Sequence, residues 1–208
     1  MPQEKSIDLS KQIKKGIAVL KKGGVIAFPT DTVYSLGASI YNESAVRKLY
    51  RIKERPFDKA LPVLVADVAQ MKQVATKLPT LAYRLAERFL PGALTLILPK
   101  SGKIHGVVTG GGDTVAVRIP DHPVPIALIK GLGGPIIGTS ANKSGHKSGI
   151  TASEVKDSLG DSVDLIIDGG KSPGGKESTI IDLTKDKPKI VREGAIPRSE
   201  IELICGLE

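Results

Sequence analysis

Positively charged side chains recur in this sequence near the ends of short apolar runs. Lys53 and Arg55 stand two positions apart, and the proline that follows should stop a helix, so we expect both to be exposed. Arg118 lies within the alternating run 114–119, where burying an unpaired guanidinium would be costly, so we expect an anionic partner. Arg192 ends another such run. Each cation alone also fits a solvated or structural charge, but the set suits recognition of phosphate and carboxylate without a covalent nucleophile.

Two hydroxyl-rich stretches directly follow apolar runs. Residues 29–37, Pro-Thr-Asp-Thr-Val-Tyr-Ser-Leu-Gly, come after the run 25–28. Ser140 and Asn142 come after the run 135–138. A buried strand that ends in such side chains directs several polar groups at one place, which suits a small polar ligand, whereas an ordinary turn is the alternative.

Residues 170–177, Gly-Lys-Ser-Pro-Gly-Gly-Lys-Glu, nearly match a phosphate-binding P-loop. Glu177, however, occupies the position where a Ser or Thr must bind Mg²⁺. The β-like run 178–181 follows where a P-loop needs a helix N-terminus. We therefore reject a P-loop, and no dinucleotide fingerprint, Ser-His-Asp arrangement or paired-carboxylate pattern replaces it. An ATP site in this chain should use different chemistry.

The composition is that of an ordinary globular protein. The 208 residues, 40% hydrophobic and 25% charged, fit one domain spanning 1–208. No apolar run approaches the roughly 20 residues that span a bilayer, and the charged N-terminus does not resemble a secretory signal. We expect a cytoplasmic protein without membrane contact. Cys205 is the only cysteine and the three histidines are scattered, which predicts no protein-held metal.

The formal net charge of +8 favours an anionic partner, although a basic surface kept for solubility is the alternative. Aromatic residues make up 3% of the chain and tryptophan is absent, so little is available for a platform that stacks on single-stranded nucleic acid. RNA, if bound, should be held through its phosphates or its shape.

Helical and strand patterns alternate along the whole chain and predict an α/β (α+β) fold, with a single twisted mixed sheet flanked by helices. Asn42 resembles an N-cap, and Thr151 with Glu154 forms a capping box. The expected helices cover 8–22, a segment after Asn42, 68–74, 80–89, 123–132, 151–159 and 199–205. The expected strands cover 25–28, 61–65, 94–98, 114–119, 135–138, 165–167, 178–182 and 189–192.

The combined motifs resemble the YrdC-like L-threonylcarbamoyladenylate synthases in their short, single-domain form. The motifs run in family order from about residue 10 to about residue 197, and each is weak alone but specific in combination. They comprise residues 29–37, 53–56, 115–120, 138–145, 177–182 and 191–194.

This resemblance implies a concave basic face and a nucleotidyltransferase reaction. L-threonine, bicarbonate or CO₂, and ATP would form threonylcarbamoyl-AMP and pyrophosphate, with Mg²⁺ carried on the nucleotide. The product would pass to a tRNA threonylcarbamoyl-transferase complex, and the basic face is a candidate surface for RNA contact. The resemblance assigns the catalytic quartet to Lys53, Arg55, Ser140 and Asn142. It assigns threonine binding to Thr32, Arg118, Gly138 and Ser178. It assigns ATP binding to Arg55, Lys59, Thr114, Ser140, Ser148 and Arg192.

Several positions depart from the family pattern. Ser35 stands where glycine is usual, Lys59-Ala60 replaces a commoner Asn-Pro, and Leu64 falls where some members have a histidine near threonine. The extra C-terminal domain of the longer family branch is expected to be absent.

Two alternatives remain beside the synthase. One is a non-catalytic RNA-binding protein of the same fold, which would not need the Ser140 and Asn142 pair. The other is a relative of the carbamoyltransferase module of hydrogenase maturation, whose zinc-finger and acylphosphatase regions have no counterpart here.

Overall fold

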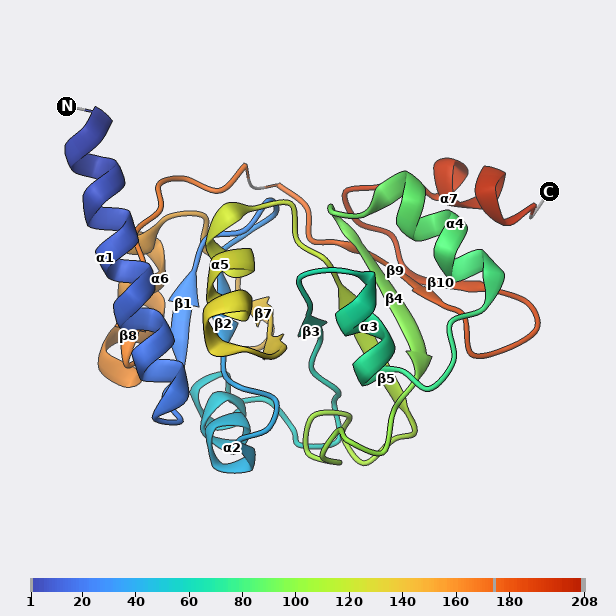
Figure 1. Cartoon of the computed structure of the whole chain (residues 1–208), viewed down its shortest axis with the longest axis horizontal. Coiled ribbons are helices and arrows are strands. Elements are labelled where there is room, and N and C mark those ends of the chain that lie inside the picture. The colour runs from blue at the N-terminus through green and yellow to red at the C-terminus, as the bar shows by residue number, and fades with distance from the viewer. Residues whose placement is uncertain (1, 174, 207–208) are drawn as a thin grey trace.

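The computed structural model describes residues 2–173 and 175–206, with side chains from residue 8 onward. Within these segments seven α-helices flank ten short strands, so the predicted α+β class is confirmed (Figure 1). The strands form two mixed sheets, one of four strands and one of six.

The smaller sheet has the strand order β7-β2-β1-β8. Its strands are β1 (Ile26–Phe28), β2 (Ser35–Gly37), β7 (Thr139–Ser140) and β8 (Leu165–Ile166). β1 and β2 pair antiparallel, so the stretch 29–37, expected as a polar strand end, is the turn of a hairpin together with its second strand. β1 also pairs with β8 in parallel, and β2 pairs with β7 antiparallel.

The larger sheet has the strand order β10-β9-β4-β5-β3-β6. Its strands are β3 (Val63–Leu64), β4 (Leu94–Pro99), β5 (Thr114–Arg118), β6 (Ile136–Ile137), β9 (Thr179–Asp182) and β10 (Lys189–Arg192). β4 pairs antiparallel with β5 and parallel with β9. All three strands come from runs that the sequence predicts as β.

The prediction of a single sheet is wrong, because the chain passes from the larger sheet to the smaller one at Gly138. β6 and β7 are separated only by this glycine, yet β6 pairs with β3 of the larger sheet and β7 with β2 of the smaller. A bridge between Ser39 and Ile136 connects the two sheets. A Cβ atom at Gly138 would lie 2.2 Å from Cγ of Leu64 in β3. Glycine therefore allows the chain to pass this close to β3.

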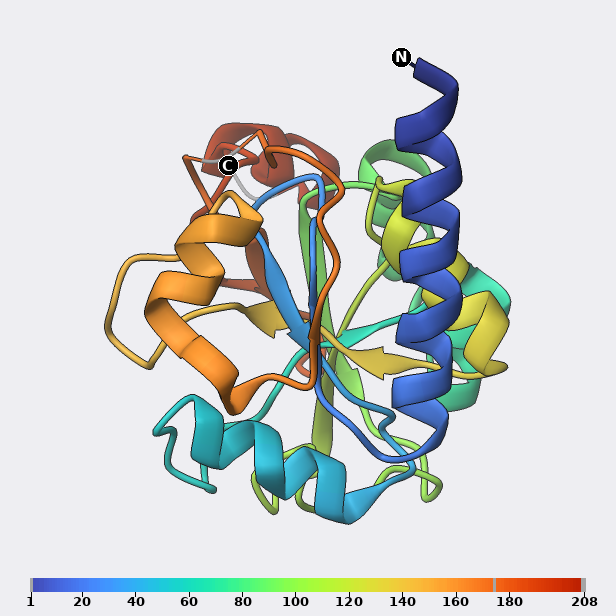
Figure 2. The ribbon, with the colours of Figure 1, turned by 90° about the vertical axis from the view of Figure 1, so that its left-hand side faces the viewer.

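Helices cover both faces of the smaller sheet and one side of the larger (Figures 1 and 2). The caps at Asn42 and Thr151 form as predicted: the Asn42 side chain accepts from Ala45 N, and the Thr151 side chain accepts from Glu154 N. The Glu154 carboxylate accepts from Ile150 N. The helices are α1 (Pro2–Lys21), α2 (Glu43–Ile52), α3 (Val68–Val74), α4 (Thr80–Phe89), α5 (Pro123–Leu132), α6 (Ala152–Leu159) and α7 (Arg198–Cys205).

Alternation along β1 divides the core into two clusters. Ile26 and Phe28 pack with Leu128 of α5 on one face, whereas Ala27 joins the larger cluster, which also contains Val155 of α6. Figure 2 shows the corresponding layers, with α1 on one side of β1 and α6 on the other. Among the described helices, none combines the length and the apolar character needed to cross a membrane.

Candidate functional site

A cavity of about 530 Å³ opens between the two sheets. Thr32, Ser35 and Ser140 line it from the smaller sheet and its hairpin, and Ile97, Ala116 and Ile180 line it from the larger sheet. Ten of the sequence-predicted residues belong to the lining: Thr32, Lys53, Arg55, Lys59, Arg118, Gly138, Ser140, Asn142, Ser178 and Arg192. Segments that are far apart in the sequence therefore meet at one place.

Arg118, at the end of β5, has the anionic partner that the sequence predicts. Its Nη2 lies 2.7 Å from Oδ1 of Asp31, and both side chains are largely buried. Its Nη1 donates to Oγ1 of Thr32 over 3.0 Å, and its Nε donates to the carbonyl of Gly92. Burial lowers the pKa of Arg118, while Asp31 opposes the shift. The Asp31 carboxylate thus compensates the charge of Arg118 at the base of the hairpin turn.

The hydroxyl of Thr32 is held in a defined orientation. Thr30 Oγ1 donates to the carbonyl of Val33 over 2.7 Å, so its single proton is committed there. In the 3.0 Å contact between the two threonine hydroxyls, Thr32 is therefore the donor. Since Thr32 also accepts from Arg118, its remaining capacity toward a ligand is that of an acceptor.

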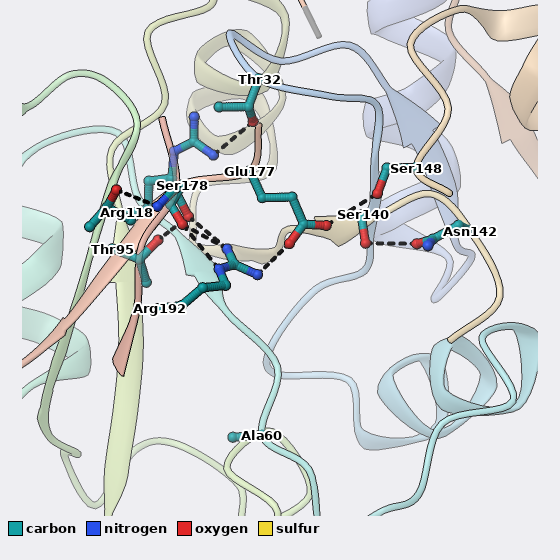
Figure 3. Close-up of polar contacts among 12 residues, drawn as sticks. Thr32, Ala60, Thr95, Arg118, Ser140, Asn142, Ser148, Glu177, Ser178 and Arg192 are labelled. Carbon is teal, nitrogen blue, oxygen red and sulfur yellow. Dashed lines mark hydrogen bonds and ion pairs between the residues drawn. The ribbon is translucent and has the colours of Figure 1, made fainter. Parts of the chain in front are cut away.

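Three of the four predicted catalytic residues form one hydrogen-bonded cluster. Nζ of Lys53 donates to the carbonyls of Ser140 (2.5 Å) and Asn142 (2.9 Å) and to Oδ1 of Asn142 (3.1 Å). Oγ of Ser140 donates to the same Oδ1 over 2.7 Å (Figure 3). Burial lowers the pKa of Lys53 from 10.5 to about 8, with Arg55 adding to the shift and Glu177 opposing it. The expectation that Lys53 is exposed is therefore wrong: its side chain is buried, because all three of its donors are used on the end of β7 and on the loop that follows.

The backbone at Glu54 explains how neighbouring cations reach one cavity. Its φ of 50° is left-handed, and the Glu54 and Arg55 amides donate to the carbonyls of Arg51 and Tyr50, a turn that ends α2. The chain reverses there, and Lys53 and Arg55 both line the cavity. Arg55 donates to the carbonyls of Lys59 and Ala60, which fixes the loop that carries Lys59.

A second cluster surrounds Arg192 at the opposite wall (Figure 3). Arg192 donates to the carbonyl of Ser178 through Nε (3.2 Å) and Nη2 (2.8 Å), and its Nη1 pairs with the Glu177 carboxylate. Oγ of Ser178 is hydrogen-bonded to Oγ1 of Thr95 over 2.8 Å. Oγ of Ser148 donates to Oε1 of Glu177 over 3.1 Å. One carboxylate therefore links two residues predicted to bind the nucleotide.

Two predicted nucleotide residues do not line the cavity. Ser148 reaches its edge through Glu177. Thr114 begins β5, four residues before Arg118, and the period of two places it on the same face as Ala116 and Arg118. It is paired with Pro99 at the far end of that strand.

The residues that depart from the family pattern have clear positions. Ser35 begins β2, lies opposite Ser140 in the ladder and lines the cavity. Lys59 lines the cavity from its loop, whereas Leu64 is buried against Gly138. In the near-P-loop stretch, Gly174 lies outside the described residues, and strand β9 follows from Thr179 where a P-loop would require a helix.

Three polar residues of the site were not assigned a role from the sequence. Asp31 and Glu177 each neutralise an arginine that is distant in the sequence, and Thr95 holds the hydroxyl of Ser178. A polar threonine within the apolar run 94–98 was the available signal for Thr95. No local sequence pattern pairs Asp31 with Arg118 or Glu177 with Arg192. Among the described residues, no group of three or more His, Cys, Asp or Glu side chains could hold a metal ion.

The fold and the site define an α+β protein with a cation-lined cavity between two mixed sheets, suited to small anionic ligands. The Sua5/YciO/YrdC family model, described as "Telomere recombination", matches residues 18–194. This chain therefore belongs to the Sua5/YciO/YrdC family.

Curated relatives extend over most of the chain. The threonylcarbamoyl-AMP synthases of Pyrococcus abyssi and Bacillus subtilis are 43% and 44% identical, and each alignment covers 94% of this chain and 57% of the relative. A putative threonylcarbamoyl-AMP synthase of Mycobacterium tuberculosis is 34% identical and is covered to 91%. The chain thus spans a little over half the length of the first two relatives and nearly all of the third.

Solved structures agree with this assignment. P. abyssi Sua5 complexed with L-threonine has a TM-score of 0.91 at 43% identity, over 93% of this chain and 57% of that one. Escherichia coli YciO has a TM-score of 0.82 at 33% identity, over 90% of this chain and 91% of that one.

Proposed function

We propose that this chain is an L-threonylcarbamoyladenylate synthase, a nucleotidyltransferase that converts L-threonine, bicarbonate or CO₂, and ATP into threonylcarbamoyl-AMP and pyrophosphate. The observation that carries the proposal is that one cavity brings the cluster of Lys53, Ser140 and Asn142 opposite the cluster of Ser178 and Arg192. The names of the relatives and the threonine bound to P. abyssi Sua5 support the same chemistry.

The proposed reaction brings two anions together. The amine of threonine captures CO₂ as a carbamate and releases a proton. A carbamate oxygen then attacks the α-phosphorus of ATP, the bond from that phosphorus to the oxygen bridging the β-phosphate breaks, and pyrophosphate leaves. The cavity offers cationic side chains on two walls to offset this repulsion, so a protein nucleophile is not required.

Threonine would lie beside Thr32, Gly138 and Ser178. Arg118 would act mainly by orienting Thr32, because Asp31 already compensates much of its charge. The nucleotide would lie along Arg55, Lys59 and Arg192, with Lys53 holding Ser140 and Asn142 in place. Thr114 and Ser148 would contact its outer parts.

Mg²⁺ would enter with the triphosphate and neutralise the leaving pyrophosphate. The donor set fits an ion held chiefly by phosphate oxygens, because cations predominate in the cavity wall. As further parts of this proposal, the reaction takes place in the cytoplasm and the product passes to a tRNA threonylcarbamoyl-transferase complex. RNA contact through the basic face is a separate expectation.

Pyrophosphate release from ATP tests this function, with threonine and bicarbonate omitted in turn. We expect release to require both. Release that is independent of threonine would contradict the proposal. Retention of RNA without any pyrophosphate release would instead favour the non-catalytic RNA-binding alternative.

A further inference from the structure

Glu177 occupies a place in the cavity that the proposed reaction leaves without a role. Its Oε2 pairs with Nη1 of Arg192, and its Oε1 accepts from Oγ of Ser148. Arg192 belongs to β10 of the larger sheet, whereas Ser148 belongs to the loop after β7 of the smaller sheet. Figure 3 shows the carboxylate between these two side chains.

The charge of Glu177 is opposite to that of the other ionised groups around it. Among the described residues that line the cavity it is the only carboxylate, and the cations of the lining are Lys53, Arg55, Lys59, Arg118 and Arg192. The influence of the carboxylate extends to Lys53, whose pKa it raises against the lowering effect of burial. A carboxylate at this position repels the phosphates that the surrounding cations attract.

The backbone of Glu177 is fixed, while its side chain has room to move. The Glu177 carbonyl accepts from Ala195 N over 2.8 Å, and Thr179 N donates to the carbonyl of Ala93. A Cβ at Gly194 would lie 2.3 Å from the Glu177 carbonyl oxygen, so the two backbones are tightly apposed. The Glu177 side chain nevertheless remains 37% exposed. The carboxylate can therefore turn toward solvent without displacing β9.

We propose that Glu177 is an internal competitor for the phosphates of the nucleotide. In the free protein its carboxylate engages Arg192 and Ser148 in the way that a phosphate oxygen would. A phosphate that enters must displace it from both residues. Glu177 thereby lowers the affinity for every phosphate-bearing ligand of this cavity, including the pyrophosphate that must leave. This inference rests on the proposed function, because it takes nucleotide and pyrophosphate as the ligands.

Titration calorimetry of Glu177→Gln tests the proposal, with AMP and inorganic pyrophosphate as probes in EDTA and again in excess Mg²⁺. Glutamine keeps the size and a hydrogen-bond acceptor but removes the charge. We expect both probes to bind about tenfold more tightly than to the wild type in EDTA, because one like charge is lost next to the phosphates. Glu177→Ala should shift affinity in the same direction.

Glu43→Gln is the matched control. It removes the same formal charge from an exposed ion pair with Arg47 on α2, away from the cavity, and should leave both affinities unchanged. Thermal midpoints should show that all variants are folded.

The outcomes separate this inference from the proposed function. Equal or weaker binding by Glu177→Gln in EDTA would overturn the competitor role. Weaker binding only in Mg²⁺ would overturn it as well, and would make Glu177 a metal ligand. A wild-type protein that binds neither probe would instead contradict the proposed function itself.

Discussion

The arginines of the cavity differ in how much of their hydrogen-bonding capacity the protein itself uses. Arg118 donates to Asp31, Thr32 and Gly92 and is largely buried, so it mainly supports the hairpin turn. Arg55 uses two of its five N–H donors on the 59–60 loop, which leaves others for a ligand. Residues of the same type therefore have different roles, according to the partners that the fold supplies.

Replacing Arg55 with alanine tests its proposed role at the nucleotide. We expect kcat/KM for ATP to fall about 100-fold, because phosphate oxygens would lose a charged donor in a partly desolvated site. Steady-state pyrophosphate release measures this. Arg51→Ala, four residues earlier in the last turn of α2 and outside the cavity lining, is the control. Wild-type activity in Arg55→Ala would refute the role.

The buried pair of Asp31 and Arg118 should matter for stability. Asp31→Asn leaves the arginine without its counter-charge, and we expect the free energy of unfolding to fall by about 3 kcal/mol. The exposed pair broken by Glu43→Gln should cost less than about 0.5 kcal/mol. Urea denaturation compares the two, and equal losses would show that burial does not govern the strength of these pairs.

Lys53 should give stability a specific pH dependence. Its folded pKa of about 8 lies below the ordinary 10.5, so between these values the unfolded chain binds more protons than the folded one. The contribution of Lys53 to the free energy of unfolding therefore rises with pH across that window, by at most roughly 1 kcal/mol per pH unit. The stability difference between wild type and Lys53→Met, from urea curves at pH 7 to 10, should increase accordingly. A stability difference that stays constant from pH 7 to 10 would contradict the lowered pKa of Lys53.

The strand pair β6 and β7 shows how a single residue divides one segment between two sheets. Gly138 allows β7 to join β2 while β6 stays paired with β3, and Leu64 of β3 occupies the space that a side chain would need. The same glycine lines the cavity, so strand geometry and the shape of the site depend on one position.

Gly138→Ala should therefore lower the free energy of unfolding by about 2 kcal/mol through overpacking against Leu64. The double variant with Leu64→Ala should lose less than the sum of the two single changes, since the added methyl group enters the space vacated. Gly102→Ala, where an added Cβ meets no atom within 4 Å, is the control. Additive losses would show that the two residues are not coupled.

The two sheets share a hydrophobic core at the scale of the whole molecule. The larger cluster joins Ala27 of β1 and Leu36 of β2 to Leu96 of β4 and Val117 of β5. The cavity therefore opens between two sheets that also share buried contacts. We expect the halves to unfold as one unit.

Val117→Ala tests this cooperativity, because it removes buried volume from the larger sheet. We expect a loss of about 2 kcal/mol. Native-state amide exchange should show protection in β1 and β2 falling by the same free energy as in β4 and β5. Unchanged protection in the smaller sheet would mean that the halves open independently.

Much of the local structure could be predicted from the sequence. The bounds 68–74 for α3 and 80–89 for α4 are those that the apolar pattern predicts, and the caps at Asn42 and Thr151 form as expected. These features depend on hydrogen bonds and packing among residues a few positions apart, which a linear reading captures. The family motifs likewise identified most of the residues that line the cavity.

Tertiary structure alone decided which partners these residues have. The pairing of Arg118 with Asp31 spans 87 positions and that of Glu177 with Ser148 spans 29. Such contacts depend on strand order, on the division at Gly138 and on the direction in which each side chain leaves its strand. The sequence by itself determined the elements and the residue types of the site. Only the packing of the two sheets decided which charges are neutralised and which face the cavity, because long-range pairing depends on the whole topology.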